Sequence, residues 1–148
     1  DQEKLDNVVN AFGVIPLSNE ELVSADLDIF SPCALGAVIN PESIKKLKCS
    51  IIAGAANNQL EKESRDSKLL LSKKIMYVPD YVINAGGLIN VANELQGYNK
   101  EKAHYEVEGI YYILMRILDY AATNNISTLE AANLLAERRV NEFIKWHH

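Results

Sequence analysis

The chain has 148 residues, of which 48% are hydrophobic and 24% charged, and its formal net charge is −5. These values are typical of a folded domain with an ordinary core, and they argue against a nucleic-acid-binding surface, which would be basic. No apolar run approaches the ~20 residues that span a bilayer, and no basic-then-apolar secretory signal is found, so we expect a cytoplasmic protein with no membrane partner.

The first quarter of the chain predicts a helix followed by two short strands. Residues 1–12 carry apolar side chains at helical spacing, and Gly13 stands where a C-terminal cap belongs. Residues 14–17 and 27–30 are short apolar runs that we predict to be strands. The acidic connection between them, residues 18–25, has room for one or two helical turns.

The middle of the chain continues the alternation. Residues 40–46 are predicted to be helical, because an Asn, a Pro and an acidic residue occupy the first three positions. Residues 50–53 form the third predicted strand. Residues 61–74 form a charged helix with Leu69, Leu70 and the following Ile75 turned inward, and residues 75–78 form the fourth strand, which ends before a proline.

The last third of the chain predicts three helices with no strand between them. The first covers residues 81–95, and the second begins at Asn99 and has apolar residues three and four positions apart. The third runs to about Ile144, and Ser127 with Glu130 forms a capping-box pattern at its start. Four strands that alternate with helices predict an α/β fold with an open, mostly parallel, Rossmann-like sheet, closed by C-terminal helices.

Three segments follow predicted strands, where open parallel sheets bind ligands: residues 31–36, 54–59 and 79–87. They are rich in small residues, two of them carry side-chain amides, and none carries Lys, Arg or His. Such segments bind and orient a ligand rather than transfer protons, although small residues and Asn also serve turn geometry alone. Cys33 and Cys49 lack metal-ligand spacing, so no metal site is predicted, and we expect Cys33 to be a small buried thiol rather than a nucleophile.

Residues 28–36, 52–60, 79–87 and 90–99 resemble successive blocks of leucine dehydrogenase and its relatives for glutamate, phenylalanine and valine. The resemblance covers nearly the whole chain, and long blocks in the right order are far more specific than a single glycine motif.

The resemblance implies the C-terminal, NAD-binding part of such an enzyme. Residues 1–96 would be a partial NAD-binding domain whose N-terminal portion is missing. Residues 97–148 would be helices that pack on the missing substrate domain or on a subunit neighbour, in a homo-oligomer.

The family catalyses reversible oxidative deamination of an L-amino acid to a 2-oxo acid and ammonia, with NAD as the hydride acceptor. By resemblance, Cys33, Ala34 and Leu35 run beside the cofactor. Asn57 and Asn58 lie by the nicotinamide ribose.

The substrate side of the site is also implied by the resemblance. Asn58 would lie near the substrate carboxylate, and Leu88 and Val91 would line the pocket for the substrate side chain. Three residues apart on a helix they share one face, which is also the spacing of ordinary core residues. Two aliphatic walls favour a branched aliphatic substrate such as leucine over a charged one; phenylalanine, valine and glutamate remain alternatives.

The sequence departs from the family pattern in what it lacks. The family's catalytic lysine and its acid partner belong to the N-terminal substrate domain, and we find neither the glycine-rich phosphate turn nor the acid that binds the adenosine ribose. We read Asp1 as a helix cap rather than that acid. The chain is therefore expected to hold no catalytic residue and to be inactive alone. Its sequence does not indicate whether NAD or NADP is preferred.

Two hypotheses follow. In the first, the chain is a fragment of a complete dehydrogenase, which we favour because its first helix has no strand before it. In the second, it is a stand-alone, catalytically inactive nucleotide-fold module that acts as an interaction partner.

Overall fold

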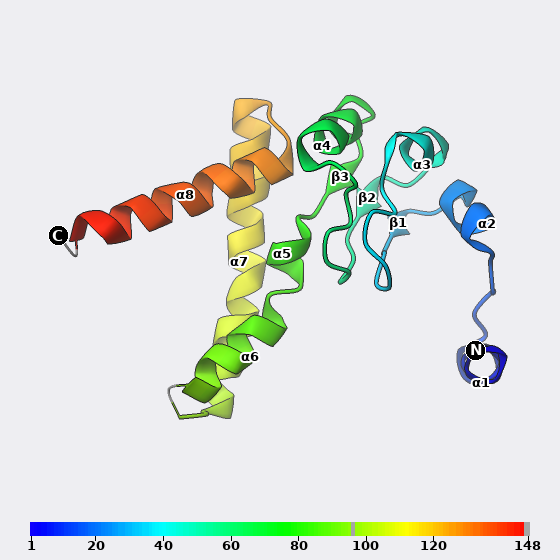
Figure 1. Cartoon of the computed structure of the whole chain (residues 1–148), viewed down its shortest axis with the longest axis horizontal. Helices are drawn as coiled ribbons and strands as arrows, with labels where there is room; N and C mark the ends of the chain where they lie inside the picture. The colour runs from blue at the N-terminus through cyan, green and yellow to red at the C-terminus, as the bar shows by residue number, and fades with distance from the viewer. Residues whose placement is uncertain (96, 147–148) are drawn as a thin grey trace.

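The computed structural model describes residues 1–95 and 97–146, without the side chain of Trp146. The described elements are, in chain order, α1 (Gln2–Phe12), α2 (Asn19–Ser24), β1 (Ile29–Phe30), α3 (Pro41–Lys46), β2 (Ile51–Ile52), α4 (Glu63–Ser72), β3 (Met76–Tyr77), α5 (Asp80–Ile83), α6 (Gly86–Leu95), α7 (Lys100–Asn124) and α8 (Thr128–Trp146). The molecule is elongated, with α1 at one end, the C-terminal part of α8 at the other and the sheet between them (Figure 1).

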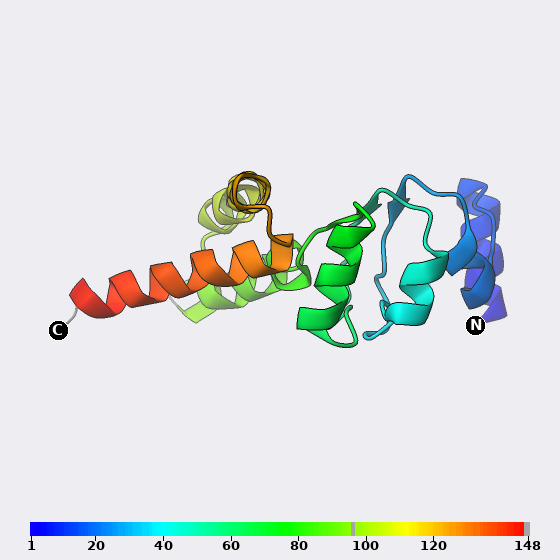
Figure 2. The same cartoon turned by 90° about the horizontal axis from the view of Figure 1, so that it is seen from above.

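The sheet is open and parallel, in the order β1-β2-β3. Phe30 pairs with Ile52, which pairs in turn with Tyr77, and α3 and α4 lie side by side in both views (Figures 1 and 2). The predicted α/β class with a parallel Rossmann-like sheet is confirmed, although the strands are shorter than predicted. The linker between α6 and α7 at residue 96, where we placed the domain boundary, lies outside the described residues.

The strand predicted at residues 14–17 is wrong. These residues form no regular element, and Ile15 is 81% exposed. Pro16 cannot donate a backbone hydrogen bond to a ladder, and the described sheet ends at β1 on that side. The short helix expected between residues 18 and 25 is confirmed as α2, with Ser18 and Glu21 as its capping box.

The core of the sheet unit is made mainly of large aliphatic and aromatic side chains from the strands, from α3 and α4, from the segments that join them and from the first turn of α8. Its buried members are Phe30, Ile39, Ile44, Leu47, Cys49, Ile52, Leu60, Leu70, Ile75, Tyr77 and Leu129. The inward orientation predicted for Leu70 and Ile75 is confirmed, and Leu69 packs against the same cluster. Burial of this apolar area is the main driving force for folding of this part.

The single helix predicted for residues 81–95 is broken into α5 and α6. Asn84 has φ −95° and ψ 9°, outside helical values, and Gly86 and Gly87, two poor helix formers, follow it. The side chain of Asn84 forms hydrogen bonds to a distant loop instead. The spacing of apolar residues did not predict this break, because the hydrogen bonds of the Asn84 side chain are made to a loop far away in the sequence.

The C-terminal helices pack around a second, smaller cluster. Its buried members are Val82, Ile117, Ala121, Ala131 and Ala132. Asn99 caps α7 by accepting from the backbone N–H of Lys102, as predicted, and Ser127 accepts from Glu130 at the start of α8. Beyond this cluster, the C-terminal half of α8 extends away from the body (Figures 1 and 2).

Candidate functional site at the carboxyl edge of the sheet

The first two loops after the strands are joined through their backbones. Ala56 N–H donates to the Pro32 carbonyl over 3.0 Å, and Ala37 N–H donates to the Asn58 carbonyl over 2.7 Å. A Cβ at Gly54 would lie 2.1 Å from the Pro32 carbonyl oxygen, so only glycine permits this approach. The predicted grouping of residues 31–36 with residues 54–59 is thus present in the fold.

The third loop is joined to the second by side chains. Asn84 Nδ2 donates to Asn57 Oδ1 over 2.6 Å and to the Ala55 carbonyl over 3.3 Å. Asp80 Oδ2 accepts from the backbone N–H of Gln59 over 3.4 Å. All three loops therefore meet at one edge, as the parallel topology requires.

The buried side chain of Gln59 stabilises the second of these loops. This side chain is fully buried, and Nε2 donates to the carbonyls of Gly54 and Ala56 over 2.6 and 2.9 Å. These bonds hold the turn that carries Asn57 and Asn58, both of which are exposed. Exposed amides on a braced turn suit recognition of a polar ligand, because each amide offers both a donor and an acceptor.

The three residues predicted to run beside the cofactor, Cys33, Ala34 and Leu35, are exposed along the same edge, and Leu35 is 77% exposed. The expected burial of Cys33 is therefore wrong, because no other segment of the described chain covers this loop. The Ser31 hydroxyl lies 3.4 Å from Cys33 Sγ, and the Ala55 N–H donates to the same sulfur over 3.5 Å. Both contacts lower the pKa of the Cys33 thiol, with Ser31 the larger cause.

Leu88 and Val91 lie on α6, directly after the third loop, and are 74% and 54% exposed. Their spacing places them on one face of the helix. Neither side chain lines the two cavities beside this helix, one between α6 and the start of α7 and the other between α5, α6, α7 and α8. Both side chains are therefore largely open to solvent in the described part of the chain.

Two residues that support the edge were not singled out by the sequence reasoning. Both Asn84 and Gln59 lie inside the blocks that resemble the dehydrogenase family. Asn84 forms hydrogen bonds to a loop far away in the sequence, and Gln59 to its own turn. The spacing of apolar residues identifies neither set of contacts. The available signal is Asn84 shortly before Gly86 and Gly87 within a helical pattern. Asn and Gly are poor helix formers, so this combination favours a break at which the Asn side chain can form hydrogen bonds with other segments.

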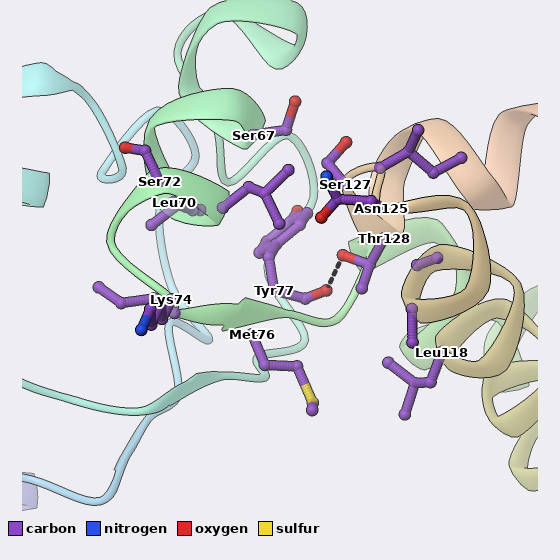
Figure 3. A pocket seen from close by; sticks show the side chains of 15 residues that line it. Ser67, Leu70, Ser72, Lys74, Met76, Tyr77, Leu118, Asn125, Ser127 and Thr128 are labelled. Carbon is purple, nitrogen blue, oxygen red and sulfur yellow. Dashed lines mark hydrogen bonds between the residues drawn. The ribbon is translucent and has the colours of Figure 1, made fainter.

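A cavity of about 470 Å³ lies elsewhere, between the end of α4, β3 and the junction of α7 with α8 (Figure 3). Its lining mixes aliphatic with polar side chains, and the Thr128 hydroxyl donates to the Tyr77 carbonyl at its wall (Figure 3). None of the predicted site residues lines it, so it is separate from the carboxyl edge.

Two negative findings concern only residues 1–95 and 97–146. None of the helices there is both long and apolar enough to cross a membrane. Within the same residues, no three His, Cys, Asp or Glu side chains are grouped so that they could hold a metal ion.

Comparison with known proteins supports the resemblance noted in the sequence. The family model for glutamate/leucine/phenylalanine/valine dehydrogenases matches residues 1–147. Leucine dehydrogenase of Thermoactinomyces intermedius is 49% identical over 139 residues, which cover 94% of this chain and 38% of that protein. The chain thus spans about two fifths of the length of the curated relatives that it matches.

Solved structures agree with this assignment. The crystal structure of L-tryptophan dehydrogenase from Nostoc punctiforme has a TM-score of 0.92 and 50% identity, covering 96% of this chain and 43% of that one. A hetero-hexameric glutamate dehydrogenase from Thermus thermophilus, at 19% identity and a TM-score of 0.72, covers 100% of this chain and 38% of that one and shares the fold.

Proposed function

Since the chain belongs to the glutamate/leucine/phenylalanine/valine dehydrogenase family, we propose that it is part of a cytoplasmic NAD-dependent enzyme that oxidises a branched-chain L-amino acid. The products are the 2-oxo acid and ammonia. The observation that supports this best is the meeting of three loops at one sheet edge, where Asn57 and Asn58 are exposed and from which the third loop leads directly into α6.

The residues at this edge fit one half of a dinucleotide site. Cys33, Ala34 and Leu35 offer small or apolar surface to a flat ring, and Asn57 with Asn58 offers amides to a ribose. NAD, when bound, supplies the ring that accepts hydride. The phosphates would be held elsewhere, because the loops described here contain no glycine-rich phosphate turn.

The chain's own contribution is binding and orientation. Asn58 would hold the substrate carboxylate, while Leu88 and Val91 would form the wall that meets its aliphatic side chain. Proton transfer would come from a lysine and an acid in a separate substrate domain. This division is what the family resemblance implies, and it is consistent with the loops, which contain no basic side chain.

An aromatic substrate is the second candidate. The relative from Nostoc punctiforme, at 50% identity, is named L-tryptophan dehydrogenase, and the leucine enzyme has a similar identity of 49%. Phenylalanine, valine and glutamate are further alternatives. A stand-alone, inactive module is the alternative that involves no catalysis.

A chimaera tests the proposal. This chain would replace the matching segment of the Thermoactinomyces intermedius enzyme, and oxidation of leucine, valine, phenylalanine, tryptophan and glutamate would be followed with NAD and with NADP. We expect activity on branched-chain substrates with NAD. A folded chimaera that oxidises none of them would contradict the proposal, and the unaltered parent enzyme is the control.

The role of Leu88 is tested in the same chimaera. Leu88→Ala removes part of the expected wall, so the ratio of kcat/KM for tryptophan to that for valine should rise by about tenfold, the usual scale for a few methylenes in a pocket. Leu95→Ala, a change of the same kind at an exposed position farther along α6, should leave the ratio unchanged. An equal effect of both changes would contradict the proposed wall.

We also propose that residues 97–148 cover the substrate domain or a neighbouring subunit in a homo-oligomer. Large apolar side chains that include Tyr112 and Val140 are exposed on α7 and α8, which is unusual for a surface without a partner. Val140→Asp should alter the size or melting temperature of the chimaera. Asn141→Asp adds the same charge one position away and should alter neither.

A further inference from the structure

The hydrogen bond between Asn84 and Asn57 has a direction that constrains both amides. Asn84 donates through Nδ2, and Asn57 accepts through Oδ1, over 2.6 Å. The second N–H of Asn84 is donated to the Ala55 carbonyl over 3.3 Å. Both N–H groups of Asn84 are therefore engaged, while its carbonyl oxygen is left to accept.

The Ala55 carbonyl determines this arrangement, because a backbone carbonyl can only accept. If the Asn84 amide turned over, its oxygen would face the Ala55 carbonyl oxygen and that bond would be lost, and Asn57 would have to turn its own amide to keep the other. An exposed Asn otherwise rotates easily about its last torsion, which exchanges a donor for an acceptor at the same position. The Ala55 carbonyl thus fixes the orientation of the Asn84 amide, and the Asn84 amide in turn fixes the orientation of the Asn57 amide.

We infer that Asn84 is a positioning residue that turns the Asn57 amide so that its NH2 group, and not its carbonyl, faces the nucleotide. The inference rests on the proposed function, because it places NAD at this edge. With Oδ1 engaged by Asn84, Asn57 offers donors to the oxygens of a ribose or a carboxamide. The break between α5 and α6 occurs at Asn84, which frees its side chain for this task.

A double-mutant cycle in the active chimaera separates action through Asn57 from direct contact. The variants are Asn84→Ala, Asn57→Ala and the two combined, with KM for NAD, kcat and the Kd for NADH measured for each. Loss of one ordinary hydrogen bond corresponds to about fivefold. We expect each single change to raise KM and Kd by about that factor, with kcat within about twofold.

The combined variant decides the inference. If Asn84 acts through Asn57, removing it when Asn57 is already Ala should have no further effect. Effects that multiply in the combined variant would overturn the inference and leave the proposed function standing. A folded, unsubstituted chimaera that neither binds NADH nor oxidises an amino acid would overturn both.

Asn84→Asp provides a second route, should Asn84→Ala fail to fold. Aspartate has the same shape but cannot donate, so Asn57 would turn its NH2 group toward the carboxylate and present its carbonyl to the nucleotide. We expect a larger rise in KM than for Asn84→Ala. The same change in the Asn57→Ala background measures the effect of the added charge alone, and an equal rise there would overturn the inference.

Discussion

The sheet unit, residues 27–78, and the helical unit, residues 80–146, bury different kinds of side chain. The sheet unit encloses large aliphatic groups, with Ile39 and Ile52 completely buried. The helical unit buries mainly alanines with Val82 and Ile117 in its own cluster, while its Leu129 is buried in the core of the sheet unit. It leaves large groups such as Tyr105 and Tyr112 exposed. The apolar face of a helix can thus be predicted from the spacing of its residues. Whether that face is buried depends on which other segment of the chain packs against it.

The largest expected effect tests the sheet unit. Ile52→Ala removes a completely buried side chain from the middle strand, so the free energy of unfolding should fall by about 4 kcal/mol through lost burial and the cavity left behind. Urea unfolding followed by far-ultraviolet circular dichroism measures the change. Ile29→Ala, one strand away and 54% exposed, should cost less than about 1 kcal/mol. Equal losses would show that the core lies elsewhere.

The second largest effect is expected when a larger side chain is introduced into the buried cluster of the helical unit. Ala131 is completely buried between helices, so Ala131→Leu should destabilise the protein by about 2 kcal/mol, because the added atoms have no space. The same change at exposed Ala136 should stay within about 0.5 kcal/mol. If Ala131→Leu is neutral in thermal unfolding, the cluster is looser than the structure indicates.

The N-terminal caps of α3 and α7 allow a third comparison of the two units, in which the expected loss of stability is smaller. Asn40 accepts from two backbone N–H groups at the start of α3, whereas Asn99 accepts from one at the start of α7. Asn40→Ala should cost about 1 kcal/mol and Asn99→Ala about half of that. A larger loss for Asn99→Ala, measured by urea unfolding, would reverse the expected order.

The two cysteines provide the smallest test, in which reactivity rather than stability is compared. A hydrogen bond with the Ser31 hydroxyl and a second one from the Ala55 N–H lower the pKa of exposed Cys33, so its thiolate forms at lower pH. Burial raises the pKa of Cys49 and restricts access to it. Iodoacetamide should therefore modify Cys33 first as the pH rises, as read by peptide mass spectrometry.

Ser31→Ala is the matched variant for this test. It removes the larger cause of the shift, so the modification of Cys33 should move to higher pH while that of Cys49 stays unchanged. Faster modification of Cys49 than of Cys33 in the unaltered chain would contradict the burial of Cys49 in the sheet unit.

Much of the fold follows from local patterns in the sequence. Capping residues placed the starts of α3, α7 and α8 correctly, since a cap is made by neighbours within a few residues. The alternation of apolar runs with helical segments predicted the parallel sheet. It failed at residues 14–17, where an apolar run that contains Pro16 has no described strand beside it.

The candidate site was predictable in part. Parallel strands carry their following loops to one edge, so the grouping of residues 31–36, 54–59 and 79–87 followed from topology alone. The roles of Asn57, Asn58, Leu88 and Val91 came from family resemblance and stay predictions.

The sequence by itself determined the fold class, the helix caps and the identity of the edge loops, because each depends on residues near one another or on a repeating pattern. Only the tertiary structure decided the break at Asn84, the exposure of Cys33 and the direction in which the Asn57 amide faces. Each of these depends on an atom far away in the sequence or on whether another described segment of the chain covers the loop, and no local pattern contains that information.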